Sequence, residues 1–157
     1  MKMTYTHALL LRYKQIFLIM LMSILIYAFL SLFLAIDKLS LHEVLSAGEI
    51  PTITEDNMIL YLLLLLGIGE IFSSFAVTGV SQRAYRATLT PGLTALLMCE
   101  SAGLTGLIQV FLACTLEISR GIAFFVASGL ALIAFSAVFM TLHYHIFTRV
   151  LKSSVGE

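Results

Sequence analysis

Charged residues are scarce in this chain of 157 residues. Lys, Arg, Asp and Glu make up 11% of it and the mean hydropathy is +1.03, whereas a soluble domain has about 25% charged residues. This excludes an ordinary water-soluble domain. The length predicts one domain, residues 1–157. We expect no nucleic-acid partner.

Cysteines and catalytic motifs are also lacking. The two cysteines, Cys99 and Cys114, lie about 22 Å apart if they share one helix, and a disulfide requires Cα atoms within about 7 Å. The sequence has no Walker loop, dinucleotide-binding glycine fingerprint, nucleophile elbow or zinc-type cysteine cluster. We therefore predict no cofactor, no metal site and no catalytic residue in this chain.

Long apolar runs dominate what is present. There are four of them, each long enough to cross a hydrocarbon core of about 30 Å. Helices are expected because each helix satisfies its own backbone hydrogen bonds in lipid. The prediction is an all-α, multi-pass integral membrane protein surrounded by a lipid bilayer. Its four helices are predicted at approximately residues 15–37, 58–80, 92–116 and 121–147.

Basic residues are concentrated in alternate connections. By the positive-inside rule, this places both termini and the loop 81–91 on the cytoplasm-like side, with helices in antiparallel hairpins. The acidic loop 37–57 then lies outside, with a short surface helix predicted around residues 39–45. The inner basic residues are Lys2, Arg12, Lys14, Arg83, Arg86, Arg149 and Lys152. The outer charged residues are Asp37, Lys38, Glu43, Glu49, Glu55, Asp56, Glu117 and Arg120.

Two carboxyl groups, Glu70 and Glu100, interrupt the apolar runs. An ionisable group inside a membrane is costly and indicates a functional site by default. Counted from the inner ends of their helices, they lie at similar depths of about 15 and 12 Å. If they approach closely, they titrate as a pair. Reversible protonation is the expected chemistry, and the structural alternative is a protonated Glu that bonds a neighbouring helix.

Small and hydroxyl-bearing residues surround both carboxyls. Ser74 follows Glu70 at helical spacing, and Thr105 follows Glu100, so we predict that Glu100, Glu70, Ser74 and Thr105 bind an ion, either a proton or sodium. Small residues allow helices to approach closely in lipid. Helix–helix contacts are therefore predicted at Gly67, Ser74, Gly103 and Gly106.

Three aromatic residues lie near the inner end of the last helix. His143 and His145 are two positions apart, so they point to different faces and do not form a metal-binding pair. Because Tyr144 lies between them and Arg149 follows, we interpret all three as interfacial anchors.

Residues 99–108, CESAGLTGLI, carry a family resemblance. They resemble the carboxylate helix of the proteolipid c-type subunits of rotary ATPases, with the pattern E-x-x-G-L-x-G-L-I. The preceding helix, with LGIG at residues 66–69, is similar to the small-residue partner helix, and the loop with Arg83 and Arg86 is similar to the family's polar loop. The extra first helix and long outer loop resemble the V-type c-double-prime subunit. The resemblance covers residues 58–116 and implies that Glu100 carries the proton or sodium ion. Glu70 has no counterpart.

Three functions remain open. The first is a proteolipid-like subunit of a proton-translocating rotary ATPase. The second is a non-catalytic accessory or assembly subunit of a large membrane complex, and the third is a small four-helix ion-coupled transporter. In the first two, the partners are other membrane subunits.

Overall fold

The computed structural model confirms the predicted fold class. It describes residues 2–40, 43–44, 50–84, 90–116 and 121–153. These ranges form four helices long and apolar enough to cross a membrane, and contain no strand. The chain is therefore a multi-pass integral membrane protein. The helices are α1 (Lys2–Lys38), α3 (Met58–Ala84), α4 (Thr90–Thr115) and α5 (Ile122–Ser153).

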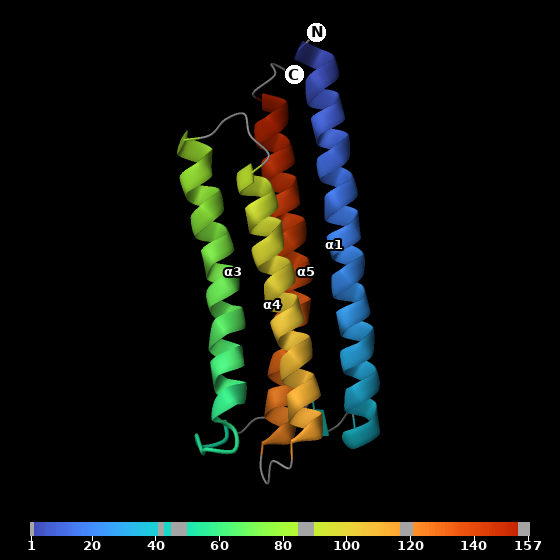
Figure 1. The fold of residues 1–157 in the computed structure, drawn as a ribbon, viewed down its shortest axis with the longest axis vertical. Helices are drawn as coiled ribbons and strands as arrows, with labels where there is room; N and C mark the ends of the chain where they lie inside the picture. Colours follow the sequence, from blue (N-terminus) through green and yellow to red (C-terminus); the bar gives the residue numbers. More distant parts are fainter. Residues whose placement is uncertain (1, 41–42, 45–49, 85–89, 117–120, 154–157) are drawn as a thin grey trace.

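Successive helices run in opposite directions, as predicted, and α1 begins at the same end of the bundle at which α5 finishes (Figure 1). α4 packs against all three other helices, while α1 and α3 occupy opposite flanks (Figure 1). α4 is also the most buried of the four spans. Side chains on different faces of α4 therefore meet different neighbouring helices.

Three helices extend further than the hydropathy pattern predicted. α1 begins at Lys2 instead of residue 15, α3 continues to Ala84 and α5 continues to Ser153. Apolar runs mark the part of a helix that lies in lipid, but backbone hydrogen bonding continues where no Gly or Pro intervenes. In α1 the extension is also packed, because Tyr13 is fully buried against Tyr144 and Phe147.

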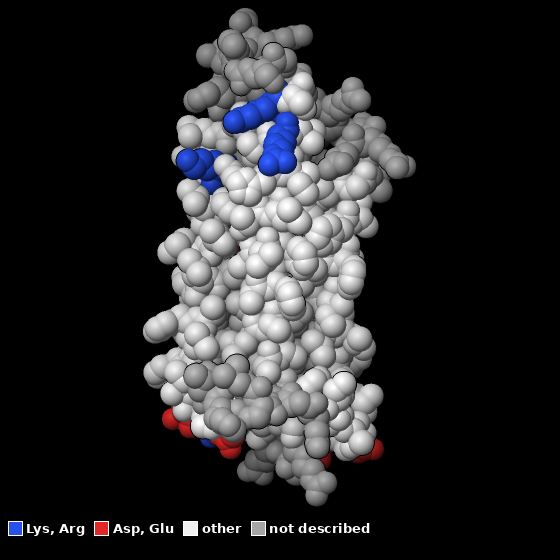
Figure 2. Space-filling view, turned by 180° about the vertical axis from the view of Figure 1, so that it is seen from behind, with Lys and Arg blue, Asp and Glu red and all other residues white. Residues whose placement is uncertain are grey.

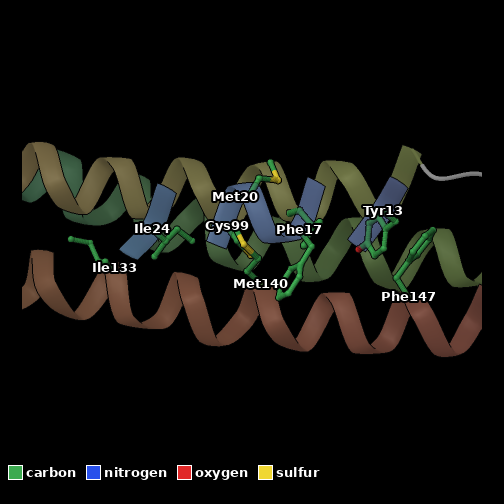
Figure 3. Close-up of a cluster of buried hydrophobic side chains, with 9 residues drawn as sticks. Tyr13, Phe17, Met20, Ile24, Cys99, Ile133, Met140 and Phe147 are labelled. Carbon is green, nitrogen blue, oxygen red and sulfur yellow. The ribbon is translucent and has the colours of Figure 1, made fainter. Parts of the chain in front are cut away.

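Buried apolar side chains fill the space between α1, α4 and α5 towards the terminal end (Figure 3). A second group, nearer the loop 50–57, includes buried side chains from all four helices. Large apolar side chains on the outer faces are exposed instead, among them Phe29 (70%) and Phe33 (68%). In water such exposure would be unfavourable, and in a bilayer it provides the lipid-facing surface. The first group consists of Tyr13, Phe17, Met20, Ile24, Leu96, Cys99, Ile133, Met140 and Phe147.

Glycines set the closest approach of α4 and α5. A Cβ placed on Gly106 would lie 2.6 Å from the carbonyl oxygen of Gly129. Two other glycines lie at other helix pairs. A Cβ on Gly67 of α3 would lie 2.8 Å from a methyl group of Leu132 on α5, and one on Gly103 of α4 would lie 3.4 Å from Ile24 on α1. The prediction that these glycines lie at helix contacts is confirmed, and it holds for Ser74, which is fully buried.

Charges separate to the two ends of the bundle (Figure 2). Basic side chains gather at the terminal end and acidic ones at the opposite end, with an apolar belt between them. This agrees with the predicted distribution, and the assignment of the terminal end to the cytoplasm-like side rests on the charge bias. The described exposed members are Arg12, Lys14, Arg149 and Lys152 at one end, and Asp37, Lys38, Glu43, Glu55 and Asp56 at the other. Glu49, Arg86, Glu117, Arg120 and the side chains of Lys2 and Arg83 lie outside the described residues.

Local hydrogen bonds shape the acidic end. Ser40 and Glu43 form a capping box: the Ser40 N–H donates to the Glu43 carboxylate at 2.8 Å, and the Glu43 N–H donates to Ser40 Oγ at 3.3 Å. This fits the predicted short helix, of which residues 43–44 are described as helical. Asn57 closes the turn before α3: its side chain accepts from the Thr54 N–H at 2.8 Å and donates to the Thr52 carbonyl at 3.0 Å. The Tyr61 hydroxyl donates to the Pro51 carbonyl.

Candidate functional site

Glu70 lies at the middle of α3 and turns its carboxyl group towards α4. Ser101 Oγ donates to Oε1 of Glu70 at 2.5 Å, and Thr105 Oγ1 donates to Oε2 at 3.2 Å. The two hydroxyls share one face of α4 because they are four residues apart. Each carboxyl oxygen thus receives its own donor from the neighbouring helix, which offsets part of the cost of a polar group in lipid.

Thr105 has a second hydrogen-bond acceptor. Its hydroxyl lies 3.0 Å from the carbonyl oxygen of Ser101, in the i−4 position on the same helix. A hydroxyl has one hydrogen, so Thr105 can direct it to Glu70 or to its own backbone. The site can therefore adjust to a charged or a protonated Glu70 by rotating one hydroxyl group.

An open groove of about 570 Å³ runs between α3 and α4 beside this carboxyl. Glu70 is half-buried, so its carboxyl is held by α4 on one side and borders the groove on the other. Gly69 widens the groove, because a Cβ there would meet nothing within 4 Å. The groove is lined by Leu65, Leu66, Gly69, Glu70, Ser73, Thr94, Leu97, Met98 and Ser101.

Glu100 lies on a different side of α4. It precedes Ser101 by one residue and so points about 100° away from the face that meets α3. Its carboxyl is half-buried and close enough to the Tyr27 phenol on α1 to interact with it electrostatically. Glu70 and Glu100 thus belong to separate helix interfaces, and among the described residues no hydrogen bond joins them.

Ser74 lies one turn from Glu70 on α3 but its hydroxyl has a different partner. Its hydroxyl is 2.8 Å from Nε2 of His143 on α5, and the Thr78 hydroxyl is 3.0 Å from Nδ1 of the same ring. His143 is 1% exposed. The interpretation of His143 as an interfacial anchor was therefore wrong. His145 is exposed, and Tyr144 is half-buried and stacks on Tyr13 and Phe17 of α1.

The structure thus divides the four sequence-predicted ion-binding residues among three places. Glu70 and Thr105 come together, with Ser101 as the additional donor. Ser74 joins a histidine, and Glu100 faces α1. The spacing of Ser101 and Thr105 on one helix face could have indicated the paired donors, whereas nothing in the sequence paired His143 with α3.

The residues that the structure describes contain no group of three or more His, Cys, Asp or Glu that could hold a metal ion. Comparisons with family models, with curated proteins and with solved structures found nothing that matches this chain. Its class therefore follows from the fold and the site. It is a multi-pass membrane protein of four helices, with a carboxyl group hydrogen-bonded by two hydroxyls beside an open groove.

Proposed function

We propose that this protein carries protons in the membrane, with Glu70 as the carboxyl group that binds and releases them. The observation that supports this most directly is the combination of two hydroxyl donors and an adjoining groove at one mid-membrane carboxyl. An ionisable group at that depth is a functional site by default, and the groove gives Glu70 an opening through which a proton donor or acceptor can approach.

The hydrogen bonds suit both forms of the group. When Glu70 is charged, Ser101 and Thr105 both donate to it. When it is protonated on Oε2, the new O–H of Glu70 donates to Thr105 Oγ1, Thr105 turns its hydrogen to the Ser101 carbonyl, and Ser101 still donates to Oε1. Neither state leaves a polar group of this cluster without a partner, so proton binding requires no movement of the helices. Sodium is the other ion that a carboxyl and two hydroxyls can hold.

A finer proposal concerns the complex in which the protein works, a proton-translocating rotary ATPase with this chain as its proteolipid-like subunit. Its support is the resemblance of residues 99–108 to the family's carboxylate helix. In that family the residue equivalent to Glu100 carries the ion. Here Glu70 borders the groove and receives two hydrogen bonds, whereas Glu100 lies on a different side of α4, near enough to Tyr27 to interact with it electrostatically, so we assign the carrier role to Glu70.

Labelling with a hydrophobic carbodiimide tests the assignment on the chain alone, because this reagent modifies protonated carboxyls that it reaches from the lipid. We expect mass spectrometry of the protein in liposomes to find the label mainly on Glu70, decreasing as the pH rises. Glu70→Gln removes this label, and the matched variant Glu100→Gln retains it. Labelling confined to Glu100 would return the carrier role to that residue, and labelling of neither carboxyl would contradict proton carriage.

The finer proposal has its own test. The tagged chain, purified from native membranes in a mild detergent, should bring with it the subunits of an ATP-hydrolysing complex. Glu70→Gln should leave that complex assembled and abolish its ATP-driven proton uptake. A chain that purifies alone and transports protons after reconstitution would instead be a small ion-coupled transporter. Co-purification with a complex in which Glu70→Gln changes no activity would identify an accessory or assembly subunit.

A further inference from the structure

His143 is a buried titratable group that the proposed carrier site does not use. It lies on α5, ten residues before the end of the helix at Ser153, on the side of the bundle where the termini and basic residues gather. Its two ring nitrogens both contact hydroxyls of α3, at 2.8 Å from Ser74 and 3.0 Å from Thr78. Both nitrogens thus have partners that can either donate or accept.

The hydroxyl hydrogens determine which form of the ring fits. Ser74 Oγ lies 2.6 Å from the Ile71 carbonyl, and Thr78 Oγ1 lies 2.7 Å from the Ser74 carbonyl. If both hydroxyls donate to these backbone oxygens, both ring nitrogens must donate to the hydroxyls, which is the protonated imidazolium. If one hydroxyl turns its hydrogen to the ring, the neutral imidazole fits. Rotation of one O–H group therefore accommodates either form without a change in packing.

The other described groups around the His143 ring form no hydrogen bond with it, so the Ser74 and Thr78 hydroxyls are the partners that distinguish its neutral and protonated forms. From α3 the Phe75 ring lies against it, with centroids 4.8 Å apart, and from α4 the buried Cys99 thiol is the titratable group near Ser74. On α1, Tyr13 and Phe17 pack on Tyr144 rather than on His143. Among the described residues no charged side chain interacts electrostatically with the His143 ring. These residues affect the ring by burying it away from solvent.

The position of the ring relates it to Glu70. Glu70, Ser74 and Thr78 succeed one another at intervals of four residues, so they follow one face of α3. His143 meets this face at Ser74 and Thr78, about 6–12 Å along the helix axis from Glu70 in the direction of the basic end. A proton that enters from that end reaches the His143 cluster before it reaches Glu70.

We propose that His143, together with Ser74 and Thr78, forms a second reversible protonation site that passes protons between the basic end of the bundle and Glu70. This inference rests on the proposed function of Glu70. The transferred species is a proton alone: one ring nitrogen accepts it from the basic end, and the ring releases it towards the Glu70 carboxylate. His143 is a relay residue and Glu70 is the terminal acceptor.

Two measurements on the full chain in liposomes test the relay. The first is nitrogen NMR of histidine-labelled protein, with the His143 signals assigned from His143→Gln. We expect a reversible change between a ring with one N–H and a ring with two between about pH 5 and 8. The second follows the infrared carbonyl band of protonated Glu70, assigned with Glu70→Gln, after a pH jump. His143→Gln keeps hydrogen-bonding capacity but does not titrate, so protonation of Glu70 should slow about tenfold or more.

The matched control is His145→Gln, because His145 lies two residues away on the same helix and is exposed. It should leave the rate of Glu70 protonation unchanged. A His143 ring that keeps one form across this pH range, or equal rates in His143→Gln and the unmodified protein, would overturn the relay and leave the proposed function intact. If Glu70 showed no titrating carbonyl band in the unmodified protein, the proposed function would fail and the relay would fail with it.

Discussion

The contact between Gly106 and Gly129 provides the sharpest test of the packing that positions the site. In Gly106→Ala the new Cβ would lie 2.6 Å from the Gly129 carbonyl oxygen, 3.0 Å from Ile133 and 3.1 Å from Leu132. A backbone oxygen cannot rotate away as a side chain can, so α4 and α5 must move apart. Overpacking of this kind costs about 1–3 kcal/mol, and we expect that loss in the free energy of unfolding.

Gly69→Ala is the matched control, because it also adds one methyl group to a membrane-spanning helix. Nothing lies within 4 Å of a Cβ at Gly69, so the substitution should be neutral or stabilise the helix by up to about 1 kcal/mol. The two variants should then differ by about 1–4 kcal/mol in unfolding titrations with a denaturing detergent in mixed micelles. Equal stabilities would show that α4 and α5 do not pack through these glycines.

Three further results are expected from other parts of the molecule. A double-mutant cycle of Ser101→Ala with Glu70→Leu, which removes both carboxyl oxygens, should give a coupling energy of about 0.6 kcal/mol and at most about 1.7 kcal/mol in the same titrations, the average and maximum measured for hydrogen bonds between membrane helices; additive effects would mean that the bond contributes nothing. In a background without the native cysteines, Glu55→Cys and Lys152→Cys should react with membrane-impermeant reagents from opposite sides of sealed vesicles, and reaction from the same side would contradict the topology. Asn57→Ala removes the two side-chain hydrogen bonds that close the turn before α3 and should cost about 1–3 kcal/mol, seen as faster exchange of the Thr54 amide; unchanged exchange there would contradict this role.

Much of the architecture followed from the sequence because lipid imposes simple rules. A run such as residues 16–36 must be helical in a bilayer, since a helix alone satisfies its backbone there. The same reasoning placed Gly67, Gly103 and Gly106 at helix contacts, because small residues permit close approach, and their surroundings confirm it. The helix ends were less well predicted, since hydropathy marks the lipid boundary and not the first hydrogen bond of α1 or the last of α5.

The sequence also indicated which polar residues could form a site in the membrane, but not which of them lie together. It indicated Glu70, Glu100, Ser74 and Thr105 as polar groups at membrane depth, and depth is all that a residue count along a helix provides. Which of them meet depends on the rotation of each helix about its own axis. That rotation is set by the packing of all four helices together, so no segment encodes it alone.

Three contacts therefore came from the tertiary structure. Because α4 lies between α1 and α3, Glu100 interacts electrostatically with Tyr27 of α1, whereas Ser101, one residue further on, bonds Glu70 of α3. His143, which follows a stretch of apolar sequence and resembles an interfacial anchor, is instead buried against Ser74. The sequence by itself determined that this is a four-helix membrane protein with costly polar groups in its spans. The docking of α3 on α4 and α5 decided which of these groups form a site, because it fixes which helix faces meet.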